Sequence, residues 1–147
     1  MNTYARSFIS AFLDHVTAWA LRQPTITGVA LVGSHARGEA RPDSDIDLVL
    51  LCTDPQAFLD DTAWLRVFGE VATCHTEDWG LVTSLRVYYR ERFEVEFGLT
   101  SLVWAALPVD PGTQSVVLNG MRILVDREGI LERLQEVVTT PQTKGRR

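Results

Sequence analysis

The sequence has 147 residues, 46% of them hydrophobic and 22% charged, which is typical of one globular domain with its own core. Its net charge of −5 argues against nonspecific nucleic-acid binding, and its only lysine, Lys144, excludes Schiff-base chemistry outside the C-terminal tail. No apolar run reaches the ~20 residues that cross a bilayer and no signal-peptide cleavage site is recognisable, so we expect no membrane association and a cytoplasmic location.

Hydrophobic periodicity predicts helices and strands in irregular alternation. The predicted helices are Thr3–Arg22, Pro55–Phe68 (capped by Asp54), Ser101–Ala106 and Glu128–Val138. The predicted strands are Ile26–Val32, Ile46–Cys52, Glu70–Thr76, Leu81–Tyr89, Phe93–Leu99 and Arg122–Val125, and Arg90-Glu91 is expected to join two of them in a hairpin. This order predicts an α+β (mixed α/β) fold, a twisted mixed β-sheet with helices packed against it, over residues 1–138. A disordered basic tail is expected over residues 139–147.

Two acids stand at the start of the second predicted strand. Alternate residues of a strand share a face, so Ile46 and Leu48 enter the core while Asp45 and Asp47 project together, with Cα atoms roughly 7 Å apart. Like charges held this close are unfavourable, and a divalent cation removes the penalty. Carboxylate oxygens suit Mg²⁺, so the pair is a candidate magnesium site, with solvated strand-start acids as the alternative. Asp43 is interpreted as a turn residue.

A glycine and a serine directly follow the first predicted strand. Gly33 permits a sharp turn and close approach of a ligand, Ser34 offers hydroxyl and N–H donors, and Arg37 adds positive charge. A helical turn from His35 would add N–H groups that suit an anion. Alone, Gly33-Ser34 is more simply a tight turn, and neither a Walker A loop nor a GxGxxG motif is present. A triphosphate carrying Mg²⁺, however, would satisfy this turn and the acid pair at once.

These two features together resemble a known family signature. The stretches Gly33-Ser34-His35-Ala36-Arg37-Gly38 and Ser44-Asp45-Ile46-Asp47-Leu48 are similar to the GSxARG…SDxDL pattern of the nucleotidyltransferase superfamily. That superfamily has the DNA polymerase beta-like fold and includes minimal and aminoglycoside nucleotidyltransferases. The resemblance implies Mg²⁺-dependent transfer of a nucleoside monophosphate, AMP from ATP, to a hydroxyl group of a protein or small molecule. It also implies that Gly33, Ser34, Arg37 and Ser44 bind the nucleotide.

The resemblance further implies a third carboxylate, which joins Asp45 and Asp47 at the metal. Phe93, Val95 and Phe97 alternate inward, so Glu94 and Glu96 share the other face of their strand. The family's acid-apolar ending favours Glu96, which would help to deprotonate the attacking hydroxyl, and Glu94 is the alternative. The family usually has aspartate here, so glutamate is a departure that adds one methylene of reach.

Several functions remain open at this point. A minimal nucleotidyltransferase is often paired with a helical HEPN-type protein in a toxin–antitoxin system, whereas an aminoglycoside-type antibiotic nucleotidyltransferase could complete its acceptor pocket as a homodimer. A non-catalytic nucleotide-binding module and a metal-dependent phosphohydrolase are further alternatives, the last disfavoured by the lack of a His-Asp pair.

Four other residues are interpreted individually. Trp79 is predicted to be a partly buried loop residue, with stacking on a base as the alternative, and Trp104 to lie in the core or at a dimer contact. Arg86 either faces the acids and a phosphate or pairs with Glu94. Cys52 is expected to be a buried thiol, because it closes an apolar run.

Overall fold

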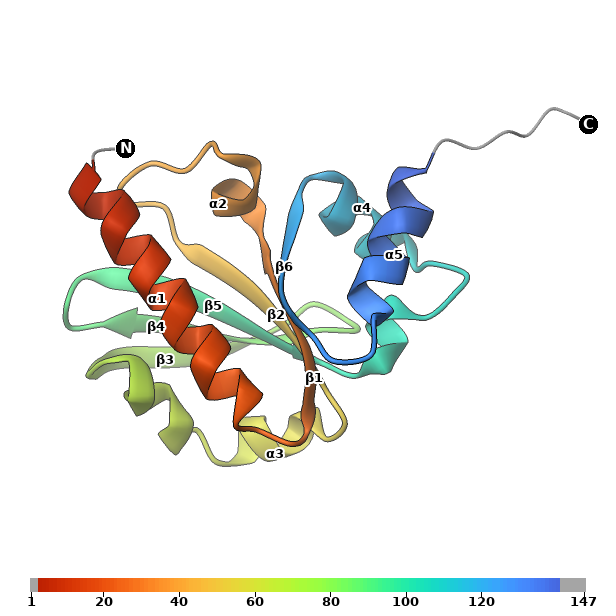
Figure 1. The fold of residues 1–147 in the computed structure, drawn as a ribbon. Coiled ribbons are helices and arrows are strands. Elements are labelled where there is room, and N and C mark those ends of the chain that lie inside the picture. Colours follow the sequence, from red (N-terminus) through yellow and green to blue (C-terminus); the bar gives the residue numbers. More distant parts are fainter. Residues whose placement is uncertain (1–2, 141–147) are drawn as a thin grey trace, which may run out of the picture.

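The computed structural model describes residues 3–140. Figure 1 shows their arrangement around a central sheet. In chain order the elements are α1 (Thr3–Leu21), β1 (Ile26–Val32), α2 (Gly33–Arg37), β2 (Ile46–Cys52), α3 (Pro55–Asp60), the 3₁₀ helix η1 (Ala63–Phe68), β3 (Val71–Asp78), β4 (Thr83–Tyr89), β5 (Phe93–Thr100), the 3₁₀ helix η2 (Leu102–Ala105), α4 (Pro111–Leu118), β6 (Met121–Asp126) and α5 (Ile130–Thr139).

A six-stranded mixed sheet organises the molecule, in the order β3-β4-β5-β2-β1-β6. The central pair β2 and β5 runs parallel, and the other neighbouring pairs are antiparallel. The predicted α+β fold with a mixed sheet is therefore confirmed. Two strands from distant parts of the sequence, β2 and β5, lie side by side at the centre of the sheet. Their pairing brings the acidic side chains of residues 45–47 next to those of residues 94–96.

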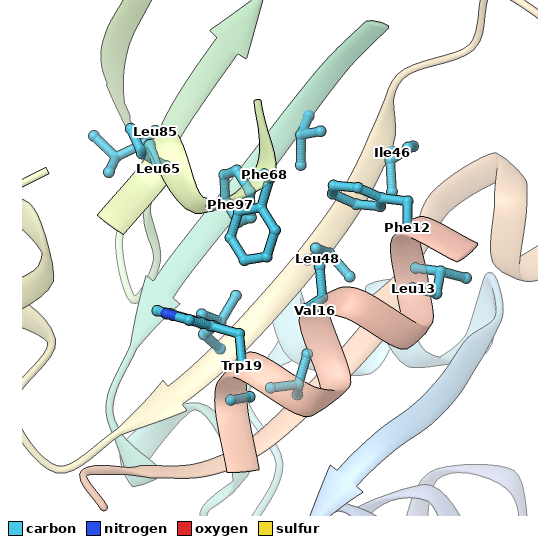
Figure 2. Packing of buried hydrophobic residues seen from close by; sticks show 14 of the residues in the cluster. Phe12, Leu13, Val16, Trp19, Ile46, Leu48, Leu65, Phe68, Leu85 and Phe97 are labelled. Atoms are coloured by element: carbon cyan, nitrogen blue, oxygen red, sulfur yellow. The ribbon is translucent and has the colours of Figure 1, made fainter. Parts of the chain in front are cut away.

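One face of the sheet packs against α1. Buried side chains recur at helical spacing along α1 and meet alternate residues of the central strands. Figure 2 shows side chains of this core, among them Phe12, Val16, Trp19, Ile46, Leu48 and Phe97. Because Ile46 and Leu48 face α1, the alternation of strand β2 turns Asp47 to the opposite side of the sheet.

A second core covers part of that opposite face. It joins residues of β1, β2 and β6 to residues of η2, α4 and α5, including Val49, Leu51, Trp104, Val117 and Leu131. Within residues 3–140, none of its members comes from β3, β4 or β5. The helices thus cover only one half of this face, and polar side chains of β4 and β5 occupy the other half.

The predicted strands and the first helix are confirmed, with small shifts at their ends. Strands β1 and β2 have the predicted bounds, β3 runs two residues further than expected, to Asp78, and β4 begins at Thr83 instead of Leu81. Cys52 is buried, as predicted. Ser101–Ala106 forms a 3₁₀ helix over Leu102–Ala105, and the Ser101 hydroxyl accepts a hydrogen bond from the N–H of Val103.

The prediction of one helix over Pro55–Phe68 is wrong. The segment divides into α3 and η1, because Asp61 is extended at φ −126° and ψ 107°. Its carboxylate accepts a hydrogen bond from the N–H of Ala63, an alternative to helical bonding that favours a turn. Asp54 precedes α3 as predicted, but its side chain makes no capping hydrogen bond.

Helix α4 was not predicted from the sequence. Asp110 and Pro111 are start signals, and the Asp110 carboxylate accepts hydrogen bonds from the N–H groups of Gly112 and Thr113. The residues that follow are poor helix formers, with glycine, threonine, serine and paired valines. The Thr113 hydroxyl donates to the Trp104 carbonyl, a tertiary contact that offsets this weak propensity.

The C-terminal prediction is only partly covered by the structure. Thr139, the first residue of the predicted tail, is the last residue of α5, and residues 141–147 lie outside the described residues. Within residues 3–140, none of the helices has the length and hydropathy needed to span a bilayer.

Candidate active site

Three carboxylates converge where β2 and β5 pair. In the sheet register Asp47 lies opposite Glu96, and Asp45 comes just before β2 on the same face. One carboxylate oxygen from each of Asp45, Asp47 and Glu96 lies within 4.8 Å of the others. Glu94, the alternative third acid, is outside this group, and Asp43 lies in a turn and is exposed. The sheet therefore brings together the three acids that the family resemblance implies.

Asp47 is the most perturbed of the three acids. Burial, followed by the charges of Asp45 and Glu96, raises the pKa of the Asp47 carboxyl from 3.8 to about 8. Its Oδ1 atom is buried and has no hydrogen-bond partner among the described residues. A buried carboxylate oxygen without a donor costs free energy, so this position favours a proton or a cation beside the oxygen.

The turn after β1 lies directly against Asp47. In the sheet register Val32 pairs with Asp47, and Gly33 follows it with φ +76°. A Cβ atom at Gly33 would lie 2.3 Å from Asp47 Oδ2, so only glycine fits both this backbone conformation and the neighbouring carboxylate. The predicted helical turn forms as α2, and Gly38, which follows its last residue, has a left-handed φ of +74°.

The four predicted nucleotide-binding residues lie in or near this turn, but they differ in whether they reach the cavity beside the acids. Gly33 and Arg37 line a cavity beside the acids, whereas Ser34 and Ser44 are not part of its wall. The Nε atom of Arg37 donates to the Glu39 carboxylate at 2.9 Å, and the Ser44 hydroxyl accepts from the N–H of Arg41 at 2.8 Å. The structure thus brings Gly33 and Arg37 to the acids, while the hydroxyl of Ser44 holds the preceding turn.

Arg86 of β4 connects the acids through one guanidinium group. Its Nη1 lies 3.1 Å from Asp45 Oδ2, and its Nη2 lies 2.7 Å from Glu96 Oε1. The same group also contacts Glu94 and Glu77. These bonds, led by those to Glu77, raise the pKa of Arg86, and they hold the pKa of Glu77 below its ordinary value. Both roles considered for Arg86, facing the acids and pairing with Glu94, are therefore present together.

A signal for this arrangement exists in the hairpin. Tyr89 pairs with Phe93 across the turn, and the antiparallel register then places Arg86 opposite Glu96. The predicted hairpin had the same turn, so counting back from it would have found this pair. The Ser84 hydroxyl, on the same face of β4 as Arg86, donates a hydrogen bond to Glu96 Oε2 at 2.9 Å. No pattern in the sequence predicts this second bond.

A cavity of about 430 Å³ lies beside the carboxylates. Asp47, Glu96 and Gly33 form part of its wall, together with the large apolar side chains of Trp79 and Trp104. Trp104 is buried in the second core, as predicted, whereas the prediction of a partly buried Trp79 is wrong because this side chain is 61% exposed. The cavity offers polar groups and an aromatic surface to one ligand.

Comparison with known families identifies the chain. Residues 9–143 match the family model described as streptomycin adenylyltransferase. The chain belongs to this family. The match covers most of the sequence, including the glycine turn, the acid pair and Glu96. The predicted relation to the nucleotidyltransferase superfamily is therefore confirmed.

Two individual proteins that resemble this streptomycin adenylyltransferase family member match only part of it. It is similar to 2′-5′-oligoadenylate synthase 3 of Rattus norvegicus, with 39% identity over 69 residues, which are 46% of this chain and 5% of that protein. It also resembles the crystal structure of an aminoglycoside 6-adenyltransferase from Bacillus subtilis, with a TM-score of 0.52 and 19% identity, over 64% of this chain and 35% of that one. The structural similarity supports the nucleotidyltransferase fold, and the chain spans only a small part of either relative.

The carboxylate group fits the divalent metal that nucleotidyltransferases usually use. Three acids offer oxygen ligands within reach of one ion, and Asp47 Oδ1 is a buried acceptor without a donor among the described residues. Oxygen-only ligation of this kind is typical of Mg²⁺ sites, in which water and substrate phosphates complete the coordination.

Proposed function

We propose that the protein transfers AMP from ATP to a hydroxyl group of an acceptor, with Mg²⁺ held by Asp45, Asp47 and Glu96. The observation that carries the proposal is the convergence of these three carboxylates beside the Gly33 turn, in a chain of the streptomycin adenylyltransferase family. A cytoplasmic location is part of the proposal, since ATP is available there.

Each group has a role that its position supports. Asp45 and Asp47 would hold Mg²⁺, which when bound would neutralise charge on the acids and the phosphates. Gly33 lets the β- and γ-phosphates approach the backbone, with Ser34, Arg37 and Ser44 as further proposed contacts. The acceptor oxygen bonds to the α-phosphorus, the bond from that phosphorus to the β-bridging oxygen breaks, and pyrophosphate leaves. Glu96 receives the hydroxyl proton, because its carboxylate lines the cavity beside Asp47.

The proposed acceptor is an aminoglycoside-type molecule. The family description supports this class, and so does the charge of the uncovered half of the sheet, where Glu77, Glu94 and Glu96 face outward around a single arginine. Aminoglycosides carry several ammonium groups, which an acidic surface attracts. Transfer to a protein, with a helical HEPN-type partner, and assembly as a homodimer remain predictions from the sequence.

The test is nucleotidyl transfer by the purified protein. We expect ATP, Mg²⁺ and a panel of aminoglycosides to give acceptor-dependent release of pyrophosphate and a mass increase of one AMP on the acceptor. Orthophosphate release would instead indicate a phosphohydrolase, and ATP binding without turnover of any acceptor would indicate a nucleotide-binding module. Either result would contradict the proposal.

A pair of acid variants tests the site itself. Asp47→Asn should lower the rate of transfer by at least about a hundredfold, because the cation loses a ligand whose Oδ1 atom is buried and without a donor among the described residues. Asp43→Asn, which changes an exposed turn acid two residues before Asp45, should transfer AMP at the wild-type rate. Equal rates for the two variants would show that Asp47 is not a metal ligand.

A further inference from the structure

Arg86 occupies an unusual position for a basic residue beside a metal-binding group. Two of its four carboxylate partners, Asp45 and Glu96, belong to the group that would hold a cation. The two contacts use different guanidinium nitrogens, Nη1 and Nη2, so a single planar group holds both carboxylates at once.

The sheet, and not a mobile loop, fixes this position. Arg86 pairs with Glu96 in the register of β4 and β5, and with His75 in the register of β3 and β4. Its side chain is only 19% exposed, and Glu77 holds the guanidinium from the β3 side through Nε and Nη2. The guanidinium therefore cannot move far from Asp45 and Glu96 without breaking bonds to other strands.

Two consequences of opposite sign follow for the protein. The guanidinium balances acids that would otherwise repel one another, which stabilises the fold without a cation. It also uses carboxylate oxygens that a cation needs, and its positive charge repels a divalent cation held by the same carboxylates.

Resting on the function proposed above, we propose that Arg86 is a positioning residue that competes with Mg²⁺ for Asp45 and Glu96. The free protein then binds Mg²⁺ weakly, and high-affinity binding requires the additional phosphate oxygens of ATP. In this way the metal and the nucleotide arrive together.

The test compares Mn²⁺ binding, followed by electron paramagnetic resonance without nucleotide, with thermal unfolding in EDTA. We expect Arg86→Gln to lower the melting temperature in EDTA and to bind Mn²⁺ about tenfold more tightly than the wild type, because the repelling charge is gone. Arg86→Lys keeps the positive charge and should bind Mn²⁺ about as weakly as the wild type. The comparison shows whether the charge of the side chain, and not the shape of the guanidinium, weakens Mn²⁺ binding. If Arg86→Gln fails to fold, Arg86→Lys takes its place in the comparison with the wild type. Weaker Mn²⁺ binding by Arg86→Lys than by the wild type would then contradict the proposal.

The matched control is Arg90→Gln. Arg90 lies at the end of the same hairpin and pairs with Glu70 at 2.9 Å, with both side chains more than half exposed. This variant should leave the Mn²⁺ affinity and the melting temperature unchanged.

The outcomes separate this inference from the function on which it rests. Unchanged or weaker Mn²⁺ binding by Arg86→Gln, with wild-type protein that binds Mn²⁺ in the presence of ATP, would overturn the role of Arg86 alone. Wild-type protein that binds no Mn²⁺ even with ATP would overturn both the role of Arg86 and the metal-dependent function.

Discussion

At the scale of single residues, the carboxyl group of Asp47 makes the stability of the metal-free protein depend on pH. Its pKa of about 8 in the folded protein lies above the ordinary value of 3.8, because burial and two neighbouring acids disfavour the charge. The folded state therefore holds a proton that the unfolded state releases, so this group stabilises the metal-free fold fully below pH 3.8. The contribution is lost as the pH rises to about 8, with a slope of at most about 1.4 kcal/mol per pH unit.

Asp47→Asn tests this linkage, because asparagine is a neutral side chain of similar shape. In EDTA, we expect the variant to have a higher free energy of unfolding than the wild type, with a difference that grows between about pH 5 and pH 8. Urea unfolding at several pH values measures it. Asp43→Asn should show no such growing difference, and parallel pH profiles for wild type and Asp47→Asn would refute the raised pKa.

Gly33 and Gly38 provide a matched pair of substitutions. Both have positive φ, but a Cβ atom at Gly38 meets no atom within 4 Å, whereas one at Gly33 collides with the Asp47 carboxylate. Gly38→Ala should cost about 1–2 kcal/mol of stability from the backbone alone. Gly33→Ala should cost more and should also weaken Mn²⁺ binding in the presence of ATP, since Asp47 must move. Equal effects on binding would indicate that the turn does not position Asp47.

The sequence predicted the acids more fully than their surroundings. Asp45, Asp47 and Glu96 follow from strand alternation and the family pattern, because both depend on residues near one another in the chain. The hairpin pattern could have revealed the pairing of Arg86 with Glu96, but the contacts of Arg86 with Asp45 and Glu77 depend on how β2 and β3 are placed in the sheet, which no local pattern reveals. The exposure of Trp79 likewise depends on which helices cover the face, and they leave its loop uncovered.

At the scale of elements, a residue beyond β6 holds the end of α1. Arg127 donates from Nη2 to the carbonyl of Leu21 at 2.8 Å and from Nε to that of Ile26 at 2.8 Å. The last carbonyls of a helix lack partners within the helix, so the guanidinium satisfies them. These partners lie more than a hundred residues away in sequence, which explains why the turn alone gave no sign of them.

Removing this side chain should loosen the packing of α1. We expect Arg127→Ala to lower the free energy of unfolding by about 1–3 kcal/mol, because the carbonyls of Leu21 and Ile26 lose a charged donor. Arg122→Ala, at an exposed position of β6, should change it by less than about 0.5 kcal/mol. Denaturant unfolding measures both, and similar values would show that the Arg127 bonds contribute little.

The elements that were predicted poorly share a physical cause. The strands and α1 have strong hydrophobic periodicity, so local pattern and tertiary packing agree. Helix α4 has weak intrinsic propensity and depends on Asp110 as a cap and on the Trp104 carbonyl as a partner for Thr113. The break between α3 and η1 depends on the side chain of Asp61 competing with the backbone. Neither effect changes the hydrophobic pattern.

At the scale of the whole molecule, the second core leaves half of one face of the sheet uncovered. Helices α4 and α5 pack over β1, β2 and β6, while Glu77 of β3 and the two glutamates of β5 surround Arg86 on the other half of this face. The solved aminoglycoside 6-adenyltransferase is much longer than this chain, which covers 35% of it. The uncovered half is where we expect the acceptor to approach.

This charge distribution predicts salt-dependent acceptor binding. We expect the Kd of a polycationic aminoglycoside to rise several-fold between low salt and about 0.5 M NaCl, because screening weakens attraction to these partly exposed acids. An uncharged sugar alcohol of similar size serves as the control ligand. Calorimetry measures the dependence, and salt-independent binding would place the acceptor elsewhere.

The parallel pairing of β2 with β5 has a consequence for how such proteins diverge. Asp47 and Glu96 are neighbours in space because two backbones lie in register, although α3, η1, β3 and β4 intervene along the chain. Added or deleted residues in the loops of that intervening stretch leave the two acids paired, whereas a single insertion inside either strand turns one acid to the opposite face. Distant homologues are therefore free to vary the interval between the two acidic segments, and a search that aligns each segment separately should detect relatives that a fixed spacing overlooks.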